Sequence, residues 1–471
     1  MVFSSNIFLF FFLPIFLIVY FITPKKFRNY SLLLFSLIFY AYGAPDFIFL
    51  LVGECVVNYF IVRGISKAKK TNAKKWLCAL SVLMALGLLL YFKYANFFVE
   101  NLNAILGWLH HEPIGWMKVA LPIGISFFTF QSITYTLDVY RSVTPPSKKL
   151  TDYVLYIMMF PQLIAGPIVN YNTVAAQLVS RESTMEGRAL GFYRFIIGLS
   201  KKVLIANTLA LYADQVFGMN YAELSTGAAW IGILSYTMQI YFDFSGYSDM
   251  AIGLGMMMGF RFPENFNDPY TSRSVTEFWK RWHITLGNFI MNYLYIPLGG
   301  NRKGQGRMYL NLWLCFLLSG LWHGASWNFV LWGAFHGLFI CADKLFLNNA
   351  LKKIGKFPSV ILTFFIVAMG WVLFRADDIA SAKGFYHALF SFKDGFHGTT
   401  DRLFWFTLAI AIIFSFLTLT KPGKRLQDLI FAEHYSQRLS WTMFAISVVL
   451  LILSAGALCV SNFNPFIYFR F

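Results

Sequence analysis

The stretch Ser319-Gly-Leu-Trp-His323-Gly-Ala-Ser-Trp-Asn328 places one histidine among glycines and tryptophans, between two apolar segments at residues 308–322 and 326–346. A titratable imidazole is costly in hydrocarbon, so histidines at membrane depth generally face the protein interior or a water-filled path and serve a function. The alternative is that His323 lies at a membrane-surface turn, hydrogen-bonded and inert. The stretch therefore predicts two membrane helices with a candidate functional histidine at their junction.

The junction also carries residues that end and begin helices. Gly320 and Gly324 are expected to weaken the helix beside His323, and Ser326 is a candidate cap for a second helix starting there. Irregular backbone at membrane depth is tolerated only where it is buried in protein or lines a cavity. We therefore expect the helix to break close to His323.

The composition of the whole chain agrees with a membrane location. Of 471 residues, 58% are hydrophobic and 13% are charged, whereas an ordinary soluble domain has about 25% charged residues. Apolar runs of membrane-spanning length recur along the chain. The sequence predicts an all-α polytopic membrane protein with about 11–13 transmembrane or re-entrant helices, the first a retained span and not a cleaved signal peptide. The main predicted spans are 7–23, 30–43, 46–62, 77–92, 119–137, 203–217, 228–258, 308–322, 326–346, 357–374, 403–419 and 440–460.

The formal net charge of +17 is distributed in short basic clusters between apolar runs. This is the pattern of cytoplasmic loops next to anionic lipid head groups, and it argues against nucleic-acid binding. The five cysteines are dispersed, without metal-ligand spacing. We expect no metal site.

Three segments are less regular. Residues 93–118 are aromatic with few basic residues, which favours an interfacial helix. Phe160-Pro161-Gln-Leu-Ile-Ala-Gly166-Pro167-Ile168 interrupts the apolar segment at 153–180, as in a broken or re-entrant helix, although an ordinary proline-kinked span is an equal alternative. Residues 261–307 form the largest polar insert, and we expect amphipathic helices at the inner interface there. Residues 376–402 are predicted to be an outer loop.

Three histidines lie in or beside membrane segments, namely His283, His323 and His336. On one straight helix the separation of thirteen positions between His323 and His336 would turn them roughly 220° apart, so they are not a metal pair of the i, i+4 kind. The sequence contains no nucleophile elbow, Walker loop or dinucleotide fingerprint. A neutral imidazole is a suitable general base for acyl transfer. By this reasoning alone, a transporter is nearly as plausible.

Cationic residues near the insert are candidates for donor binding. Lys280, Arg281 and Arg302 can steer a phosphate-bearing donor, although charges at an interface are often only snorkelling anchors. Trp282 and Trp322, each next to a histidine, complete the candidate cavity residues.

Several motifs in order resemble the membrane-bound O-acyltransferase superfamily, and within it the bacterial branch of alginate O-acetylation. The resemblance runs along nearly the whole chain and is most specific in the insert and at the His323 junction. The motifs are Met1-Val-Phe-Ser-Ser5, Phe160–Ile168, Asp243-Phe-Ser-Gly-Tyr-Ser-Asp249, Pro263-Glu-Asn-Phe-Asn-Asp-Pro-Tyr270, Thr276-Glu-Phe-Trp-Lys-Arg-Trp-His283, Tyr295-Ile-Pro-Leu-Gly-Gly-Asn-Arg302 and Gly320-Leu-Trp-His-Gly324.

The resemblance implies one integral-membrane domain over residues 1–471, with a core motif region at about 120–346 and C-terminal spans at 357–460. It further implies a curved ring of helices around a tunnel across the membrane. His323 falls on the family's catalytic histidine, His283 on a second histidine of supporting role, and Arg302 in a segment typical of the branch. Lys280 stands where an arginine is common, which preserves the charge but not a bidentate contact.

The function implied is transfer of an acetyl group from a cytoplasmic thioester, most simply acetyl-CoA, for O-acetylation of an extracytoplasmic polysaccharide. No bound cofactor is expected. The expected partners are membrane lipid, the acyl thioester donor, an extracytoplasmic SGNH-type acetyltransferase and a glycan synthase, and the expected location is the bacterial cytoplasmic membrane. Two alternatives stay open: D-alanyl transfer to teichoic acid from a carrier-protein thioester, and a polysaccharide or lipid transporter.

Overall fold

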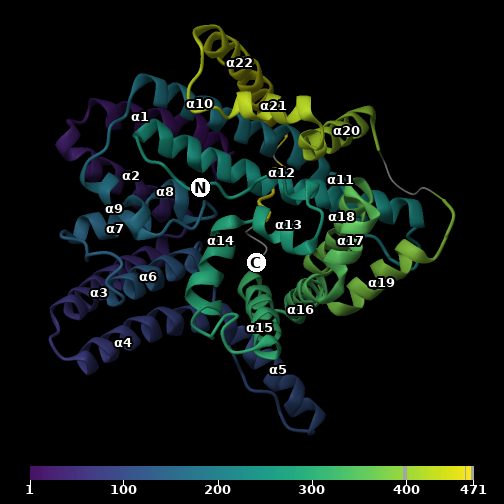
Figure 1. Cartoon of the computed structure of the whole chain (residues 1–471), viewed down its shortest axis with the longest axis horizontal. Coiled ribbons are helices and arrows are strands. Elements are labelled where there is room, and N and C mark those ends of the chain that lie inside the picture. Colours follow the sequence, from purple (N-terminus) through teal and green to yellow (C-terminus); the bar gives the residue numbers. More distant parts are fainter. Residues whose placement is uncertain (396–399, 462, 468–471) are drawn as a thin grey trace. The chain divides into compact units, whose positions relative to one another are not determined.

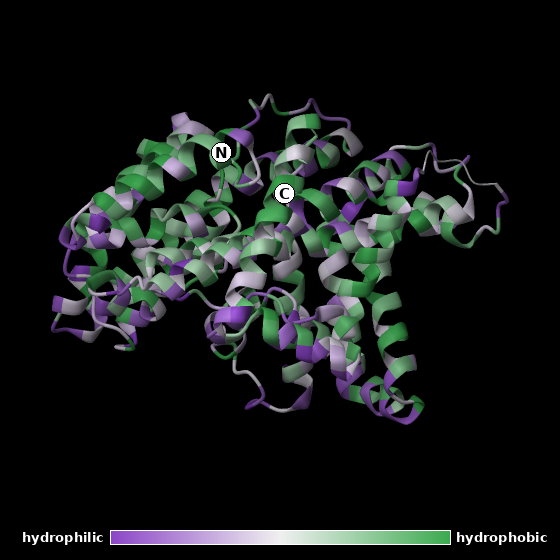
Figure 2. Cartoon of the chain, turned by 90° about the horizontal axis from the view of Figure 1, so that it is seen from above, coloured by the Kyte–Doolittle hydropathy of each residue, from purple (hydrophilic) through white to green (hydrophobic). Residues whose placement is uncertain are grey.

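The computed structural model describes residues 1–395, 400–461 and 463–467, and helices account for most of them (Figure 1). Within those residues one isolated bridge, Phe266 with Trp282, is the only β-type pairing. Seven helices in the described part are long and apolar enough to cross a membrane: Pro45–Lys67, Thr71–Trp108, Met185–Phe217, Trp327–Ile354, Lys356–Arg375, Arg402–Leu419 and Gln437–Val460. Hydrophobic residues run along most helices (Figure 2). The predicted all-α polytopic membrane class is confirmed.

The chain divides into two compact units. Unit 1 contains residues 1–184 and 258–262, and unit 2 contains residues 185–257 and 263–471. The elements of unit 1 are η1 (Phe8–Phe12), α1 (Leu13–Ile22), η2 (Lys25–Phe27), α2 (Arg28–Gly43), η3 (Pro45–Phe47), α3 (Ile48–Lys67), α4 (Thr71–Leu89), η4 (Leu90–Tyr94), α5 (Ala95–Trp108), α6 (Ile125–Tyr140), α7 (Leu150–Met158), α8 (Phe160–Leu163) and α9 (Tyr171–Val179).

Unit 1 has an aromatic core. Phe160 lies 5.0 Å from Phe16, 5.4 Å from Phe12 and 5.5 Å from Phe39, measured between ring centroids. Phe160 begins the one-turn helix α8, directly after the chain leaves the helical conformation at Met159. Because Pro161 can only start a helix, the apolar segment breaks here, and the broken-helix interpretation of residues 153–180 is confirmed.

The predicted helix within residues 93–118 is present as α5, but it is shorter than predicted and is not a separate helix. Residues 95–108 continue α4 through a π-helical turn into one helix of 38 residues, Thr71–Trp108, because no proline or glycine interrupts residues 88–106. Residues 109–124 are not helical.

Unit 2 contains the longer run of elements. They are α10 (Met185–Ser200), η5 (Lys201–Ala206), α11 (Asn207–Phe217), α12 (Thr226–Met258, whose last residue belongs to unit 1), η6 (Pro269–Thr271), α13 (Val275–Arg281), α14 (Ile284–Ile290), η7 (Met291–Tyr295), α15 (Gln305–His323), α16 (Trp327–Ala342), η8 (Asp343–Leu347), α17 (Asn348–Ile354), α18 (Lys356–Arg375), α19 (Ile379–Phe390), η9 (Leu417–Leu419), α20 (Arg402–Phe416), α21 (Lys421–Ile430) and α22 (Gln437–Val460).

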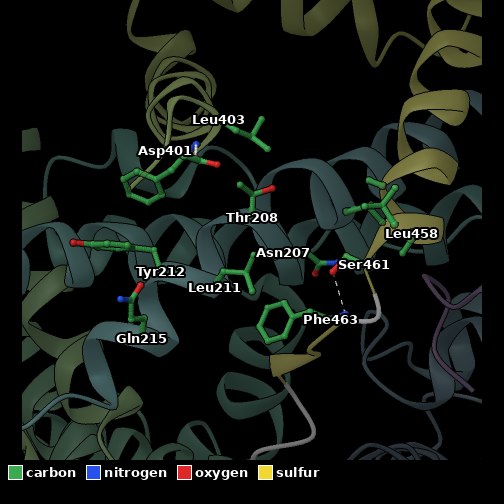
Figure 3. A pocket seen from close by; sticks show the side chains of 14 residues that line it. Asn207, Thr208, Leu211, Tyr212, Gln215, Asp401, Leu403, Leu458, Ser461 and Phe463 are labelled. Atoms are coloured by element: carbon green, nitrogen blue, oxygen red, sulfur yellow. Dashed lines mark hydrogen bonds between the residues drawn. The ribbon is translucent and has the colours of Figure 1, made fainter. Parts of the chain in front are cut away.

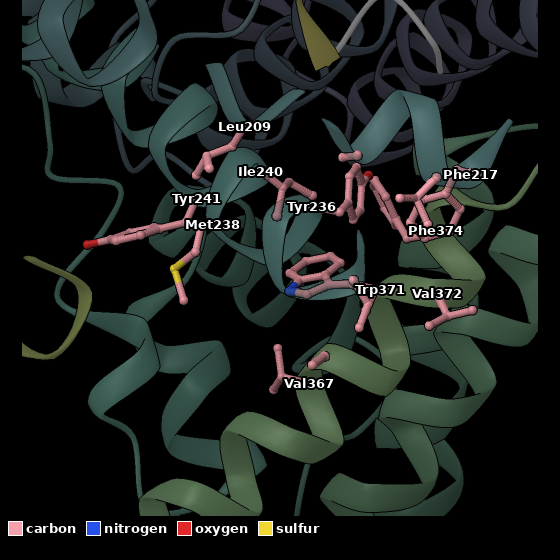
Figure 4. Close-up of a cluster of buried hydrophobic side chains, with 14 of the residues drawn as sticks. Leu209, Phe217, Tyr236, Met238, Ile240, Tyr241, Val367, Trp371, Val372 and Phe374 are labelled. Atoms are coloured by element: carbon pink, nitrogen blue, oxygen red, sulfur yellow. The ribbon is translucent and has the colours of Figure 1, made fainter. Parts of the chain in front are cut away.

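The core of unit 2 is formed by α11, α12, α18, α19 and α20, with Trp371 of α18 at its centre (Figure 4). Helix α19 lies within residues 376–402, which the sequence predicts to be a loop. Asp378 caps this helix, since its carboxylate accepts a hydrogen bond from the Ser381 amide at 2.7 Å, and Phe385 stacks on Phe217 at 4.2 Å. Packing against α11 therefore stabilises a helix that is too short to be recognised as a span.

Candidate functional site

The site is built on the hairpin of α15 and α16, which pack at unusually short range. A Cβ atom at Gly320 would lie 2.1 Å from the Phe329 carbonyl oxygen, and one at Gly333 would lie 2.4 Å from the Phe316 carbonyl oxygen. Helix α15 runs through Gly320 without a break and ends at His323. The expected break close to His323 is confirmed at Gly324, whose backbone is extended, whereas at Gly320 the missing side chain allows the two backbones to approach.

Helix α16 begins at Trp327, so Ser326 occupies the N-cap position as predicted. Its backbone is extended, with φ −149° and ψ 159°, but its hydroxyl accepts no capping hydrogen bond. In the turn between the helices, the Phe329 ring instead lies directly against Gly324. A Cβ atom at Gly324 would overlap this ring at 2.1 Å. The position of the turn was predictable from the sequence, whereas the packing that fixes it was not.

His323 is buried, with 6% of its surface exposed, and its ring is surrounded by aromatic rings. The ring centroids of Trp322, Trp332 and Phe374 lie 4.7, 5.1 and 5.2 Å away, each at a steep angle. His323 also lines a small cavity. The space open to the centre of a water molecule there is about 10 Å³, which is room for about one water. The other lining residues are Ile240, Phe244, Trp282, Trp332, Trp371, Phe374 and Ile467.

His283 lies in the same region, and Trp322 lies next to both histidines. The His283 ring is 6.1 Å from Trp322 and 4.8 Å from Phe244, a residue that also lines the His323 cavity. Its Nδ1 lies 3.1 Å from Asn265 Oδ1. Because a carbonyl oxygen only accepts, Nδ1 carries the proton and Nε2 is the basic nitrogen. Burial lowers the pKa of His283 to about 3, so the ring is neutral at physiological pH.

The backbone around His283 explains how it is held. His283 adopts φ 46° and ψ 53° at the start of α14, a left-handed conformation that costs energy for a residue with a side chain. Asn265 Oδ1 also accepts from the amide and the hydroxyl of Thr285, at 3.2 and 2.9 Å. One buried amide oxygen thus fixes both the ring and the strained turn.

The structure brings four of the seven predicted site residues together and leaves three apart. His323 and Trp282 line the cavity, and Trp322 and His283 lie beside it. Arg302 is exposed in the turn before α15, and Lys280 is exposed on α13. Arg281 forms an ion pair with Glu277 at 2.5 Å and donates to the Thr271 hydroxyl at 3.0 Å. None of these three cations lines the cavity.

Several residues of the site were not predicted from the sequence. Asn265 lies within one of the quoted motifs, and its spacing from His283 gave no reason to connect them. Phe374 and Ile467 come from α18 and from the C-terminal segment, far away in the chain. Asp243, which begins another of the quoted motifs, is buried in the same unit.

A proton acceptor in a nearly dry aromatic cavity is suited to base catalysis on a small, uncharged group. Among the described residues no three His, Cys, Asp or Glu side chains lie close enough to hold a metal ion. The His323 and His336 imidazoles lie on different helices, α15 and α16, and both contact the Trp332 ring.

A multi-pass helical bundle with a buried histidine in an aromatic cavity is an architecture that fits a membrane enzyme or a transporter. Residues 143–350 match the sequence profile of the membrane-bound O-acyltransferase family, MBOAT. The chain is 43% identical to the probable alginate O-acetylase AlgI of Pseudomonas putida over 100% of both chains. It is 38% identical to the peptidoglycan O-acetyltransferase of Helicobacter pylori, over 81% of this chain and 78% of that one. The chain belongs to the MBOAT family, and it is an acyltransferase.

The comparisons also bear on the alternatives that the residues left open. The predicted resemblance to the alginate O-acetylase branch is confirmed by the similarity over the full length. The teichoic acid D-alanyltransferase of Bacillus subtilis is more distant, at 26% identity over 59% of this chain and 72% of that one. A transporter is not supported.

Proposed function

We propose that this protein is a membrane O-acetyltransferase with His323 as its general base. The observation that carries the proposal is the aromatic cavity that holds His323. In the reaction, His323 accepts the proton of an attacking hydroxyl, the hydroxyl oxygen bonds to the thioester carbonyl carbon, and the carbon–sulfur bond breaks. The proton then passes to the leaving thiolate, which departs as a thiol. A positioned base of this kind contributes about 10²- to 10⁴-fold in rate.

The size of the cavity supports a small acyl group. The cavity has room for about one water molecule, which is less than an acetyl group occupies, so even acetyl requires its aromatic walls to move slightly. A long acyl chain would have to displace several buried aromatic rings. The printed names of the alginate and peptidoglycan relatives also refer to O-acetyl transfer.

His283 supports His323 in this proposal without necessarily touching substrate. Its Nδ1–H is held by Asn265, and Trp322 lies next to both imidazole rings. We assign His283, Trp282 and Trp322 to shaping the cavity wall that orients the His323 ring.

The acetyl donor in this proposal is a cytoplasmic thioester, most simply acetyl-CoA, used as a substrate and not as a bound cofactor. Lys280 and Arg302 are exposed, and as cations they attract the donor's phosphates. The acceptor is an extracytoplasmic polysaccharide, reached through an SGNH-type acetyltransferase partner beside a glycan synthase. The location is the bacterial cytoplasmic membrane.

A His323→Ala variant tests the proposal in cells whose surface acetylation depends on this protein. Cell-surface acetyl ester is expected to disappear while the amount of protein in the membrane stays normal. Full surface acetylation by this variant would remove the central claim.

The donor is tested with purified protein and radiolabelled acetyl-CoA. Transfer of label from the free thioester supports the acetyl donor. The second candidate, D-alanyl transfer, is favoured only by the similarity to the D-alanyltransferase. An enzyme of that kind requires a carrier-protein thioester and leaves free acetyl-CoA unused.

A further inference from the structure

A buried ion pair lies close to the His323 cavity and has no part in the proposed reaction. Lys202 Nζ and Asp243 Oδ1 are 2.8 Å apart, and each side chain is 1% exposed. Lys202 belongs to η5, the π-helical segment between α10 and α11, and Asp243 lies in the middle of α12. A buried ion pair generally stabilises a fold little, because desolvation of both charges offsets their attraction. Charged residues at membrane depth are usually functional.

Both members of the pair bind the backbone of the same short segment near the C-terminus. Lys202 Nζ donates to the Pro465 carbonyl oxygen, and the Ile467 amide donates to Asp243 Oδ2 at 3.0 Å. Two further contacts hold the segment. Asn207 Nδ2 donates to Asn464 Oδ1 at 3.1 Å, and Phe466 stacks on Tyr247 with ring centroids 4.7 Å apart.

This C-terminal segment, residues 463–467, contributes to two cavities of unit 2. Ile467 forms part of the wall of the His323 cavity. Phe463 lines a second and larger cavity of about 460 Å³, shown in Figure 3, where the Phe463 amide donates to the Ser461 hydroxyl at 3.1 Å. Displacing the segment would therefore open the His323 cavity on the side of Ile467.

We infer that Lys202 and Asp243 are positioning residues that hold the C-terminal segment as a wall of the His323 cavity. Lys202 binds the Pro465 carbonyl and Asp243 binds the Ile467 amide. The segment is therefore held by its main chain, and these two residues cannot shift along the pair. This division explains why the pair is charged: an apolar pair of similar volume would pack as well but would leave the Pro465 carbonyl and the Ile467 amide without partners. The effect on acetyl transfer rests on the proposed function, whereas the position of the segment does not.

The first experiment measures the position of the segment directly in the full-length purified protein. In a background whose five native cysteines are replaced by alanine, Ile467→Cys provides one thiol, which reacts with a water-soluble maleimide. We expect the Lys202→Met/Asp243→Leu double variant to be labelled at least tenfold faster than the parent. Removing both charges together avoids leaving one of them buried and unpaired. Lys201→Met is the matched control, because Lys201 pairs with Asp249 and not with the segment, and its labelling rate should equal that of the parent.

The second experiment measures acetyl transfer in the wild-type cysteine background. The double variant should lose at least tenfold in rate while its melting temperature stays within a few degrees of the parent. Equal labelling rates in the parent and the double variant would overturn the inference. So would a released segment with undiminished acetyl transfer.

If the double variant fails to fold, a substitution within the segment tests the same inference. Ile467→Pro removes the amide that binds Asp243 and leaves the ion pair intact, whereas Ile467→Ala keeps the amide. We expect at least tenfold slower acetyl transfer for Ile467→Pro than for Ile467→Ala at the same melting temperature. Equal rates would contradict the inference. If His323→Ala retained activity, the proposed function would fail, but the labelling result would still decide the position of the segment.

Discussion

His323 and His336 both pack against Trp332, with ring centroids 5.1 and 5.0 Å from it, yet their surroundings differ. His323 lines a cavity. His336 is fully buried among Trp279, Trp332 and Phe335. A Cβ atom at Gly370 would lie 2.5 Å from its Nε2, and neither of its ring nitrogens has a hydrogen-bond partner within the described residues. Residue type and burial therefore do not distinguish the proposed general base from a packed histidine, whereas the space beside the ring differs between them.

The largest expected effect is the difference between the two histidines themselves. His323→Gln should lower acetyl transfer by about 10²- to 10⁴-fold, because a general base is lost. His336→Gln should lower it less than about tenfold and mainly reduce stability, since a packed ring is replaced by a more flexible side chain. Initial rates with purified protein, together with melting temperatures, measure both. If both variants lost a comparable factor in rate with unchanged melting temperatures, the two histidines would not differ in function as predicted.

The close packing of α15 on α16 places both histidines on one tryptophan, and Gly320→Ala should disrupt it. The added Cβ meets a backbone carbonyl at 2.1 Å, so the helices must separate, at a cost of about 3 kcal/mol. Thermal unfolding in detergent measures the loss. Gly306→Ala is the matched control on the same helix, since a Cβ there meets nothing within 4 Å, and it should be neutral or slightly stabilising. Equal melting temperatures for the two variants would show that the helices are not in close contact.

A smaller effect is expected at Asn265. Its side chain is the hydrogen-bond partner of His283, whereas His336 has no such partner within the described residues. Asn265→Ala removes the acceptor for His283 Nδ1 and for both Thr285 donors, at a cost of about 1–3 kcal/mol. Acetyl transfer should fall about tenfold, with a matching fall in melting temperature. Asn267→Ala, at an exposed neighbouring position, should change neither quantity. An unaffected Asn265→Ala variant would show that His283 does not need this acceptor.

The smallest effect concerns the protonation of His283. Burial lowers its pKa to about 3 in the folded protein, whereas an unfolded histidine has a pKa of about 6.5. Between these values the unfolded state binds more protons, so the contribution to stability is complete above pH 6.5 and decreases as the pH falls toward 3. The slope is at most about 1.4 kcal/mol per pH unit.

Melting temperatures of the parent and of His283→Gln between pH 7.5 and 5 measure this contribution. The parent should lose more stability than the variant as the solution becomes acidic. Parallel pH profiles would mean that His283 has an ordinary pKa.

Part of this structure was predictable from local sequence. The apolar segments at 308–322 and 326–346 predict α15 and α16 to within a few residues, because a membrane helix needs only a sufficient length of apolar residues. Pro161 predicts the break after α7, because proline restricts the chain locally. Helix α19 and the continuous helix through residues 90–108 were missed, because tertiary packing and a π-helical turn determine them.

The sequence by itself determined the class of this protein, the position of most of its long apolar helices and His323 as the first candidate residue, because hydrophobic length and a costly intramembrane imidazole are local properties. Only the tertiary structure decided which imidazole has space beside it and which residues form the wall of its cavity. Asn265, Phe374 and Ile467 reach the site from three separate elements. Their contacts depend on how distant parts of the chain pack together, and the spacing of these residues along the sequence does not predict that packing.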